Sequence, residues 1–316
     1  MKRIDEIIRA FEQQFDSIGI IQSSRFFAES KRRHIDAKMP PYPTTLVCSL
    51  AYPKRVIKPI DGFVVPSFYT FGQDYHHVLK TRIHQAIAPF SVAYEVGVDN
   101  HPYDERLAAV LAGVGFFGRN QLIIHPTLGT YHFLGLVFLD ITIQEEYTHP
   151  IDDSCGTCEA CIKACPAKAL SLDGYEIQKC ISAFNQSKRL LTLSEAQLNY
   201  CLFGCDLCQL ACPKNKNVVS PTYPEWELSG KELLAIEDLF TLTEKAFKAK
   251  YSGMAYLWKG KTILMRNTIA LLLKQKNPTY NSFIQNSIKP DSAHWYREFA
   301  LGALSILTNQ NKSIPE

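Results

Sequence analysis

Residues 155–166 read CGTCEACIKACP, which places four cysteines and a closing proline within twelve positions. A second run, FGCDLCQLACP at residues 203–213, holds three more cysteines and also ends in Cys-Pro. Thiolates are soft ligands, and such a density of them indicates metal or redox chemistry, so these two runs decide what the middle of the chain folds around. The seven thiols are Cys155, Cys158, Cys161, Cys165, Cys205, Cys208 and Cys212.

The spacing of the first run is the one that bacterial ferredoxins use, in which three cysteines bind one [4Fe–4S] cluster and the fourth binds another. Two such clusters need eight thiolates, and Cys180 and Cys201 are both candidates for the eighth. Zinc is the alternative, but a zinc ion takes four ligands and has no use for the third closely spaced thiol. We therefore expect two [4Fe–4S] clusters, with Cys165 and Cys212 each crossing to the other set.

The bulk composition is that of a globular protein with sizeable cores: 316 residues, 46% of them hydrophobic and 21% charged. A net charge of +3 argues only weakly for an anionic partner. The first residues, MKRIDEIIRAFEQQF, carry charges throughout, so we expect no secretory signal. No apolar run is long enough to span a membrane, and ten cysteines fit metal chemistry in a reducing, cytoplasmic setting.

The hydrophobic pattern divides the chain into three zones and predicts an α+β fold. Residues 1–150 mix helical and strand patterns and are expected to form an α/β domain. Residues 151–219 are expected to fold around the clusters as a ferredoxin-like domain. Residues 220–316 read as paired helices, which favours a short HEAT-like domain. The predicted elements are helices at 3–15, 74–88, 103–113, 232–242, 245–251, 264–275, 281–288 and 295–307, and strands at 45–50, 91–96, 121–125 and 132–140.

A glycine-rich stretch, GVGFFGRN at residues 113–120, lies between a predicted helix and a predicted strand. It has two interpretations. It is typical of a helix end followed by a turn, and it also suits backbone approach to a large flat or phosphate-bearing cofactor. No acidic residue follows at the spacing that a nicotinamide cofactor's ribose would need, which argues against NAD.

Several motifs together resemble the epoxyqueuosine reductase family. They are VDNHPYDER at 98–106, AGVGFFGRNQLIIHP at 112–126, CGTCEACIKACPAKAL at 155–170, KCISAFNQSKR at 179–189 and FGCDLCQLACP, with FGQDYHHVLK at 71–80 and LMRNTIALLL at 264–273 as weaker matches. The resemblance implies a cobalamin-dependent oxidoreductase that converts the epoxide of epoxyqueuosine to the alkene of queuosine at the tRNA wobble position. This is the last step of queuosine biosynthesis, and two [4Fe–4S] clusters would feed electrons to cob(II)alamin.

The resemblance also assigns residues. It implies one cluster on Cys155, Cys158, Cys161 and Cys212, and another on Cys165, Cys180, Cys205 and Cys208, so that Cys180 rather than Cys201 is the eighth ligand. Asp99 matches the family's proton donor and a cobalamin contact, and Arg189 matches a tRNA contact. Arg119 stands where the family usually has lysine. The other cobalamin-lining positions are Ile123, Leu134, Ser182, Cys205 and Asp206.

The partners implied are a tRNA with a GUN anticodon that carries epoxyqueuosine and a small electron-donor protein of the flavodoxin or ferredoxin type. The enzyme itself is expected to be a monomer. Two other classes stay open. One is a cobalamin and iron–sulfur reductase for another substrate, such as a dehalogenase, and the other is a non-enzymatic electron-transfer protein. The helical tail is expected to be separable from the clusters, because every implied ligand precedes residue 213.

Asp99 also has a bland interpretation, since its DN and HP neighbours are typical of a turn or a helix cap. If it lies against an apolar corrin face, desolvation should raise its pKa and keep it able to donate a proton. A set of basic residues is expected near tRNA phosphates, although a solvated face is the simpler explanation. Besides Arg189, this set comprises Lys188, Lys214, Lys216, Lys259, Lys261 and Arg266.

Overall fold

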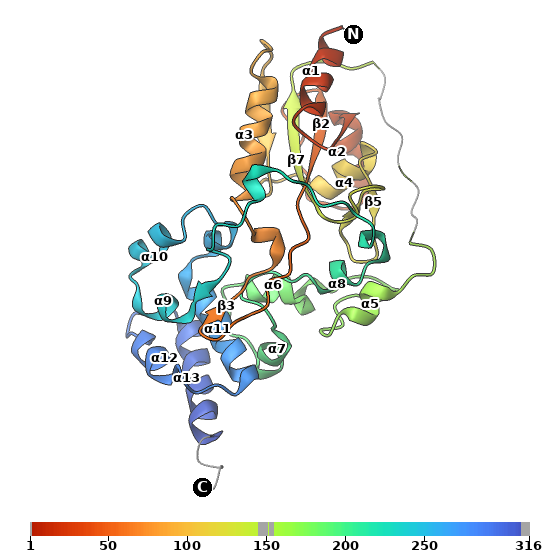
Figure 1. Cartoon of the computed structure of the whole chain (residues 1–316). Helices are drawn as coiled ribbons and strands as arrows, with labels where there is room; N and C mark the ends of the chain where they lie inside the picture. The colour runs from red at the N-terminus through yellow and green to blue at the C-terminus, as the bar shows by residue number, and fades with distance from the viewer. Residues whose placement is uncertain (1, 145–150, 152–154, 311–316) are drawn as a thin grey trace. The chain divides into compact units, whose positions relative to one another are not determined.

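The computed structural model describes residues 2–144, 151 and 155–310, and these form two compact units (Figure 1). Unit 1 is drawn from the described residues of Met1–Lys54, Asp74–Cys161 and Gln209–Trp226. Unit 2 is drawn from those of Arg55–Gln73, Ile162–Cys208 and Glu227–Glu316. Each unit combines segments from different zones of the sequence. The division into three consecutive domains therefore stays a prediction.

Unit 1 is built on a four-stranded antiparallel sheet in the order β1-β2-β7-β4. Its strands are β1 (Ser17–Gln22), β2 (Thr44–Ala51), β7 (His132–Leu139) and β4 (Tyr94–Gly97). The register pairs Cys48 with Gly135 and Val96 with Val137. The predicted strands at 45–50 and 132–140 are confirmed, and β4 overlaps the one expected at 91–96. The prediction missed β1.

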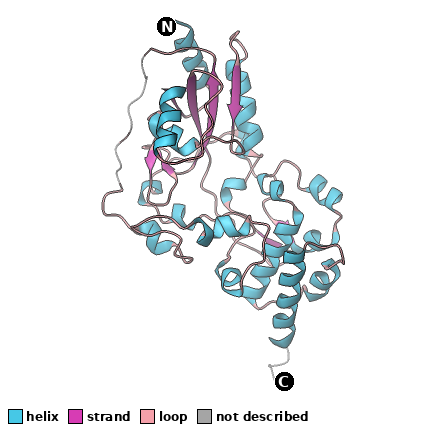
Figure 2. Cartoon of the chain, turned by 180° about the vertical axis from the view of Figure 1, so that it is seen from behind, coloured by secondary structure: helices cyan, strands magenta, loops and turns pink. Residues whose placement is uncertain are grey.

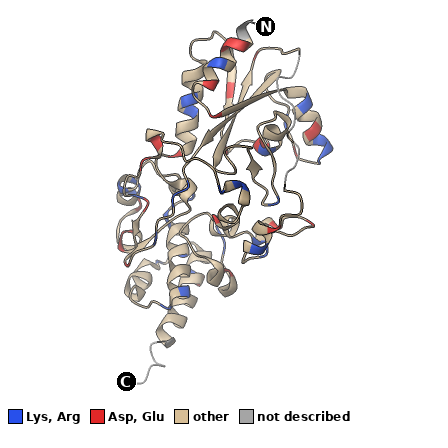
Figure 3. Ribbon diagram, turned by 45° about the vertical axis from the view of Figure 1, so that its right-hand side comes forward, with Lys and Arg blue, Asp and Glu red and all other residues tan. Residues whose placement is uncertain are grey.

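Helices cover both faces of this sheet, as Figure 2 shows. On one face Leu136 and Phe138 share a buried cluster with Leu107 of helix α4 (Glu105–Leu111), next to helix α2 (Ser23–Arg32). On the other face Gly135 leaves room for Leu79 and Ile83 of helix α3 (Tyr75–Ile87), which packs on α1 (Lys2–Glu12). Because both faces are covered, every residue of β2 is buried, and the strands in Figure 3 carry almost no charge.

Local sequence signals fix the ends of the two helices that matter for the site. Asp74 caps α3 by accepting from the backbone N–H of His76. Asp104 caps α4 by accepting from the N–H groups of Arg106 and Leu107. Gly113, with φ of 70°, follows the last turn of α4 in the left-handed conformation that favours glycine. The helices predicted at 3–15, 74–88 and 103–113 are therefore confirmed, with somewhat shorter bounds.

The glycine-rich stretch forms a helix end followed by a small hairpin. Strand β5 (Phe116–Phe117) pairs antiparallel with β6 (Ile123–Ile124), which lies within the strand predicted at 121–125. A Cβ at Gly115 would lie 2.6 Å from the carbonyl oxygen of Ile124, so only glycine fits that position. The first two glycines thus serve backbone packing, as the turn interpretation of the motif predicted.

Unit 2 is mainly helical, with one short strand pair between β3 (Phe63–Val64) and β8 (Leu234–Ala235). The helices predicted beyond residue 230 are confirmed, while a HEAT-like arrangement remains a prediction. They are α9 (Ile236–Thr241), α10 (Glu244–Lys250), α11 (Lys261–Gln275), α12 (Asn281–Ser287) and α13 (His294–Gln310). The remaining short helices of the cysteine zone are α5 (Ala160–Ala164), α6 (Ile181–Asn185), α7 (Leu193–Leu198) and α8 (Leu207–Leu210).

The tail helices share one hydrophobic core with the cysteine zone. Ile181, Phe184 and Phe203 are buried in the same cluster as Leu264 and Phe299. This core does not support the expectation that the tail can be separated from the clusters, because removing the tail would expose the segments that carry Cys180 and Cys205. Within the described residues, no helix is long and apolar enough to cross a bilayer.

Arg266 of α11 is a polar anchor inside that core and is fully buried. Its guanidinium donates to the carbonyl oxygens of Phe184, Asn185, Ser187 and Arg189 at 2.6–3.1 Å. Burial lowers the pKa of Arg266 to about 9, which still leaves it charged at neutral pH. Arg266 therefore holds the chain after α6 and is not free to meet phosphate groups, contrary to the expectation from sequence.

Candidate functional site

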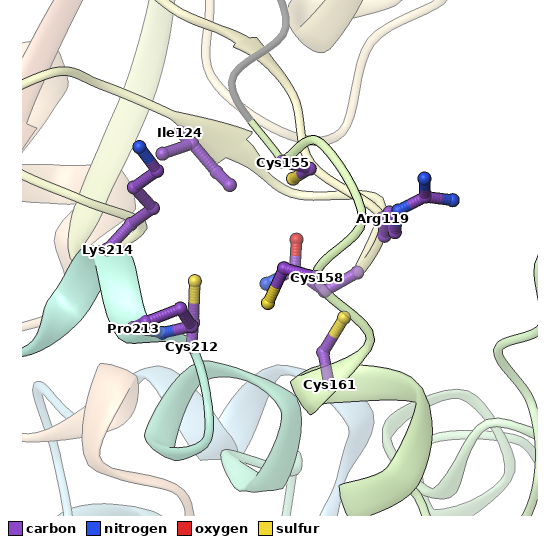
Figure 4. A pocket seen from close by; sticks show the side chains of 9 residues that line it. Arg119, Ile124, Cys155, Cys158, Cys161, Cys212, Pro213 and Lys214 are labelled. Carbon is purple, nitrogen blue, oxygen red and sulfur yellow. The ribbon is translucent and has the colours of Figure 1, made fainter.

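Four cysteines of unit 1 line one hollow. Figure 4 shows the sulfur atoms of Cys155, Cys158, Cys161 and Cys212 around it. Arg119, Asn120, Ile124, Pro213 and Lys214 complete the lining. Burial raises the pKa of Cys212, and the neighbouring thiolates of Cys155 and Cys158 raise it further. Like charges repel in this way only when they lie close together, so the thiols of Cys155, Cys158 and Cys212 are near enough to interact.

The cysteines of the second implied set all lie in unit 2. Cys180 is the N-cap residue of α6, and the sulfur of Cys165 accepts from the backbone N–H of Ala169 at 3.3 Å. Burial raises the pKa of Cys205 to about 11, and the nearby charge of Cys180 contributes in the same direction. The thiols of Cys180 and Cys205 are therefore close enough to interact.

Paired hydrogen bonds fix the segments that carry these two thiols. The amide of Asn185 at the end of α6 donates to the carbonyl oxygen of Gly204 at 2.8 Å and accepts from its N–H at 3.1 Å. Asn267 of α11 donates to the carbonyl oxygens of Asn185 and Leu202 at 2.7 and 2.8 Å. Helix α11 thus holds both ligand-bearing segments in place, although it supplies no cysteine itself.

The Cys201 thiol is engaged with the backbone, although its charge also interacts with that of Cys205. The residue is buried, and its thiol donates to the carbonyl oxygen of Gly204 at 3.2 Å. Burial raises its pKa well above the ordinary value for a thiol. A thiol held against backbone in this way is a poor source of thiolate, so the geometry favours Cys180 over Cys201 as the eighth ligand.

Asp99 lies at the end of β4 in the left-handed backbone conformation, with φ of 55°. Its backbone N–H donates to Glu105 Oε1 at 2.8 Å, which ties the loop to the first turn of α4. The carboxylate oxygen Oδ2 meets two groups of α3, the Tyr75 hydroxyl at 3.0 Å and His76 Nε2 at 3.0 Å. The acid is therefore part of a network and is not merely a turn or capping residue.

The expected rise in the pKa of Asp99 depends on a corrin face against the carboxyl and stays a prediction, whereas the described residues act in the opposite direction. The hydrogen bond from His76 lowers the pKa of Asp99, and this effect outweighs the opposing effect of burial. Burial alone would lower the pKa of His76, but the hydrogen bonds to Asp74 and Asp99 raise it to about 9. At neutral pH the pair is accordingly a carboxylate and an imidazolium, and the proton resides on His76.

A cavity of about 170 Å³ in unit 1 brings together three of the sequence-predicted site residues, Asp99, Ile123 and Leu134. Phe133 and Tyr75 also line it, and their rings stack with centroids 4.2 Å apart. The cavity has an apolar wall and a carboxylate at its edge. It is smaller than a typical pocket for a small molecule, so it would hold only part of a large ligand.

The other predicted residues of this group lie in unit 2. Ser182 accepts from the side-chain amide of Gln186 at 3.0 Å. The buried carboxylate of Asp206 accepts from the Ser67 hydroxyl and from the N–H of Phe68, and burial raises its pKa to about 6. Its side chain therefore holds the 67–68 segment, and its backbone N–H donates to the Tyr200 hydroxyl, so Asp206 is tied to the protein at both ends.

Arg189, the predicted tRNA contact, is half-exposed and pairs with Glu195 of α7 through two hydrogen bonds of 2.5 and 2.9 Å. A planar guanidinium in such a two-point pair is held in one orientation. Lys261, from the expected basic set, is buried and donates to the carbonyl oxygen of Leu242. Like Arg266, it is a structural residue.

Comparison with known proteins decides the family. Residues 154–215 match the 4Fe-4S double cluster binding domain. An epoxyqueuosine reductase from Lactococcus garvieae is 30% identical over 264 residues, which cover 78% of this chain and 72% of the relative. The chain belongs to the epoxyqueuosine reductase family.

Two further matches describe how far this likeness reaches. An epoxyqueuosine reductase from Bacillus anthracis is 33% identical over 244 residues, or 74% of this chain and 63% of the relative. The crystal structure of an epoxyqueuosine reductase with an epoxyqueuosine-modified tRNA-Tyr stem loop superposes with a TM-score of 0.83 at 22% identity, covering all of this chain and 95% of that one. The fold of the family is thus present over the whole described chain.

Within this epoxyqueuosine reductase family member, sequence reasoning missed three contributors to the site. They are His76 with its second partner Asp74, Glu105 under the Asp99 loop, and the Arg266–Asn267 pair. A signal existed for the first, because DYHH places a histidine two residues after a helix-capping aspartate. The contacts of the Arg266–Asn267 pair span at least 65 residues of chain, and the contact of Glu105 depends on the backbone conformation of Asp99. No local sequence pattern encodes either of them.

Proposed function

We propose that this chain reduces the epoxide of epoxyqueuosine to the alkene of queuosine at the wobble position of tRNA. The observation that carries the proposal is its 30% identity to an epoxyqueuosine reductase over 72% of that relative's length. The match of residues 154–215 to a double cluster domain supports it, since the reaction consumes electrons. An electron-transfer protein would account for the cysteines but not for the Asp99 cavity.

Eight thiols would hold the two [4Fe–4S] clusters, in the two sets described above. Cob(II)alamin would lie against Ile123 and Leu134, with Ser182, Cys205 and Asp206 as further contacts. The apolar wall of the Asp99 cavity fits a flat ring system with low polarity. When bound, the clusters would supply single electrons and the cobalamin would supply a redox-active cobalt centre for the reduction of the epoxide.

The chain's own chemical contribution is the proton supply. Converting an epoxide to an alkene takes up two electrons and two protons, breaks both C–O bonds and releases water. Asp99 would deliver a proton from Oδ2 to the leaving oxygen as the general acid. Because the resting proton lies on His76, its Nε2 would protonate Asp99 as the oxygen begins to leave, and the charge on Asp74 would stabilise His76 in its charged form.

The partners follow from the reaction. The substrate would be tRNA with a GUN anticodon, and Arg189 would contact its backbone. A small flavodoxin- or ferredoxin-type protein would supply electrons to a monomeric, cytoplasmic enzyme. The tRNA stem loop bound to an epoxyqueuosine reductase of the same fold supports the choice of substrate.

The decisive experiment is anaerobic reconstitution with iron, sulfide and cobalamin, followed by nucleoside analysis of tRNA that carries epoxyqueuosine. Loss of epoxyqueuosine with matching gain of queuosine is the expected result. Full cluster loading and cobalamin uptake without any queuosine, under a strong chemical reductant, would refute the proposal. Omitting cobalamin is the matched control, because it should abolish turnover while leaving the iron content unchanged.

A further inference from the structure

Asn120 ends the glycine-rich stretch GVGFFGRN, and no function described so far uses it. The residue is only 6% exposed. It lines the same hollow as Cys155, Cys158, Cys161 and Cys212. A buried polar side chain beside four thiols needs a hydrogen-bonding partner. The geometry of the Asn120 amide indicates what kind of group that partner is.

The orientation of the Asn120 amide follows from one hydrogen bond. Its oxygen Oδ1 accepts from the backbone N–H of Leu122 at 3.2 Å, so the other end of the amide must be the NH₂ group. Gly118 permits this pose, because a Cβ there would lie 2.6 Å from the same oxygen. The hairpin therefore fixes the Asn120 side chain. Its Oδ1 is bound to the Leu122 N–H, and its NH₂ group is the other end of the amide.

That donor end is unsatisfied. Among the described residues, Nδ2 of Asn120 is buried and has no hydrogen-bond acceptor. Leaving a buried donor unpaired is unfavourable, and such a group in a native structure indicates a partner that the protein chain itself does not supply. An anionic [4Fe–4S] cluster in the adjacent hollow would present sulfur atoms as acceptors.

Arg119 lines the same hollow, but its guanidinium is engaged elsewhere. Its Nη2 donates to the carbonyl oxygen of Gly156 at 2.8 Å, which braces the turn between Cys155 and Cys158. Figure 4 shows its guanidinium pointing away from the hollow. Arg119 thus shapes the ligand loop with its Nη2, although its buried Nε also lacks a partner among the described residues. The Asn120 amide is the donor that the hairpin holds fixed at the hollow.

We infer that Asn120 Nδ2 donates a hydrogen bond to a sulfur of the cluster held by Cys155, Cys158, Cys161 and Cys212, and thereby raises its reduction potential. The inference rests on the double-cluster assignment of the proposed function. An N–H donor stabilises the reduced cluster more than the oxidised one, because reduction adds negative charge to the sulfur atoms. Gly118, the third glycine of the motif, then has a function, because it leaves room for the Asn120 amide in this pose.

The test compares Asn120→Asp with the parent protein after anaerobic reconstitution, without cobalamin or tRNA. The aspartate retains an oxygen for the Leu122 N–H but replaces the NH₂ donor with an acceptor. Potentiometric titration followed by electron paramagnetic resonance should show one cluster with a lower midpoint potential and the other unchanged. Gln121→Glu is the control, because it adds the same charge one residue along while keeping the Asn120 donor, and its shift should be much smaller.

A second variant separates loss of the donor from added charge. Asn120→Ser offers a hydroxyl acceptor to the Leu122 N–H on a side chain one atom shorter, and it too should lower the potential of one cluster. Unchanged potentials in both variants at full iron and sulfide content would overturn the inference. If neither variant binds the first cluster, the reduced parent protein labelled with ¹⁵N-asparagine should show a ¹⁵N hyperfine coupling, and absence of that coupling overturns it.

Discussion

His76 bridges two carboxylates: its Nε2 lies 3.0 Å from Asp99 Oδ2, and its Nδ1 lies 2.7 Å from Asp74 Oδ1. The Tyr75 ring stacks on the imidazole with centroids 3.9 Å apart. This arrangement holds a proton next to the cavity that Asp99 lines. It also makes the site sensitive to substitutions at either end of the bridge.

Replacing Asp99 with asparagine should lower turnover by roughly 10²-fold or more, because the amide cannot transfer a proton. Asparagine tolerates the left-handed backbone at this position, so the loop should keep its conformation. Single-turnover assays on fully loaded enzyme check the rate, and Asp140→Asn on the exposed residue at the end of β7 is the control. A near-parental rate for Asp99→Asn would leave water or another side chain as the acid.

The same bridge predicts a specific pH dependence of stability. The pKa of His76 is raised from 6.5 to about 9, so its pairing stabilises the fold fully below pH 6.5, as long as Asp74 and Asp99 are ionised, and the contribution is lost as pH rises through 9. His76→Gln should therefore lower the free energy of unfolding most near pH 6 and little above pH 9.

Urea denaturation across pH 5–10 measures this difference. Tyr75, His77, His101 and Glu105 are titratable groups near this network, and they are unchanged in the variant. His294→Gln is the control, since the His294 side chain is 79% exposed. A His76→Gln effect that is the same at every pH would mean that His76 acts by packing and not by charge.

The metal content should be about eight iron atoms per chain after anaerobic reconstitution, as two [4Fe–4S] clusters require. Cys201→Ser should leave iron and acid-labile sulfide unchanged, because the Cys201 thiol is engaged with backbone carbonyls. Cys180→Ser should lose or perturb one cluster. The assignment of the eighth ligand fails if these two variants behave in the opposite way.

Arg266→Met should reduce the free energy of unfolding by about 3 kcal/mol, because it leaves several buried carbonyl oxygens without donors. The lower stability should appear together with loss of the second cluster. The reason is that Arg266 anchors the end of α6, the helix that Cys180 caps. Arg297→Met on the exposed face of α13 is the matched control. Thermal unfolding with parallel iron analysis gives both results, and a stable variant with full iron content would contradict the anchoring role.

Arg189→Gln should weaken tRNA binding and reduce the slope of log affinity against log salt by about 1, as loss of one phosphate contact would. Binding measured at several salt concentrations checks this. Arg297→Gln provides a control with the same charge change at another exposed site of unit 2. An unchanged slope would mean that Arg189 serves only to hold Glu195.

The elements with strong local patterns could be predicted from sequence. Strand β7 is a run of apolar residues, α11 is a long apolar helix, and the cysteine spacing marks the clusters directly. Strand β1 was missed because SIGIIQ contains a glycine, which is uncommon in strands. That glycine is needed for packing, since a Cβ at Gly19 would clash with the carbonyl oxygen of Ala112.

The functional assignment of charged residues was less predictable. Arg266 and Lys261 look like surface residues in the sequence, yet both are buried and bind backbone carbonyls. The pKa of Asp99 depends on a histidine 23 residues away, which the helix-cap signal at Asp74 places but does not orient. Such effects arise from tertiary contacts, and residue type and spacing alone do not contain them.

The last segment of unit 1, Gln209–Trp226, is synthesised after the rest of that unit. Trp226 is buried, donates from Nε1 to the carbonyl oxygen of Ala51 at 2.8 Å, and packs on Phe133. A ribosome adding about 5–20 residues per second needs roughly 5–20 s to travel from Phe133 to Trp226. During that interval the nascent sheet lacks its last covering residue, and Cys155, Cys158 and Cys161 emerge before Cys212. Iron–sulfur insertion should therefore follow translation of this final segment, so that a chain stalled before Cys212 would present three thiols to oxidants without a cluster to protect them.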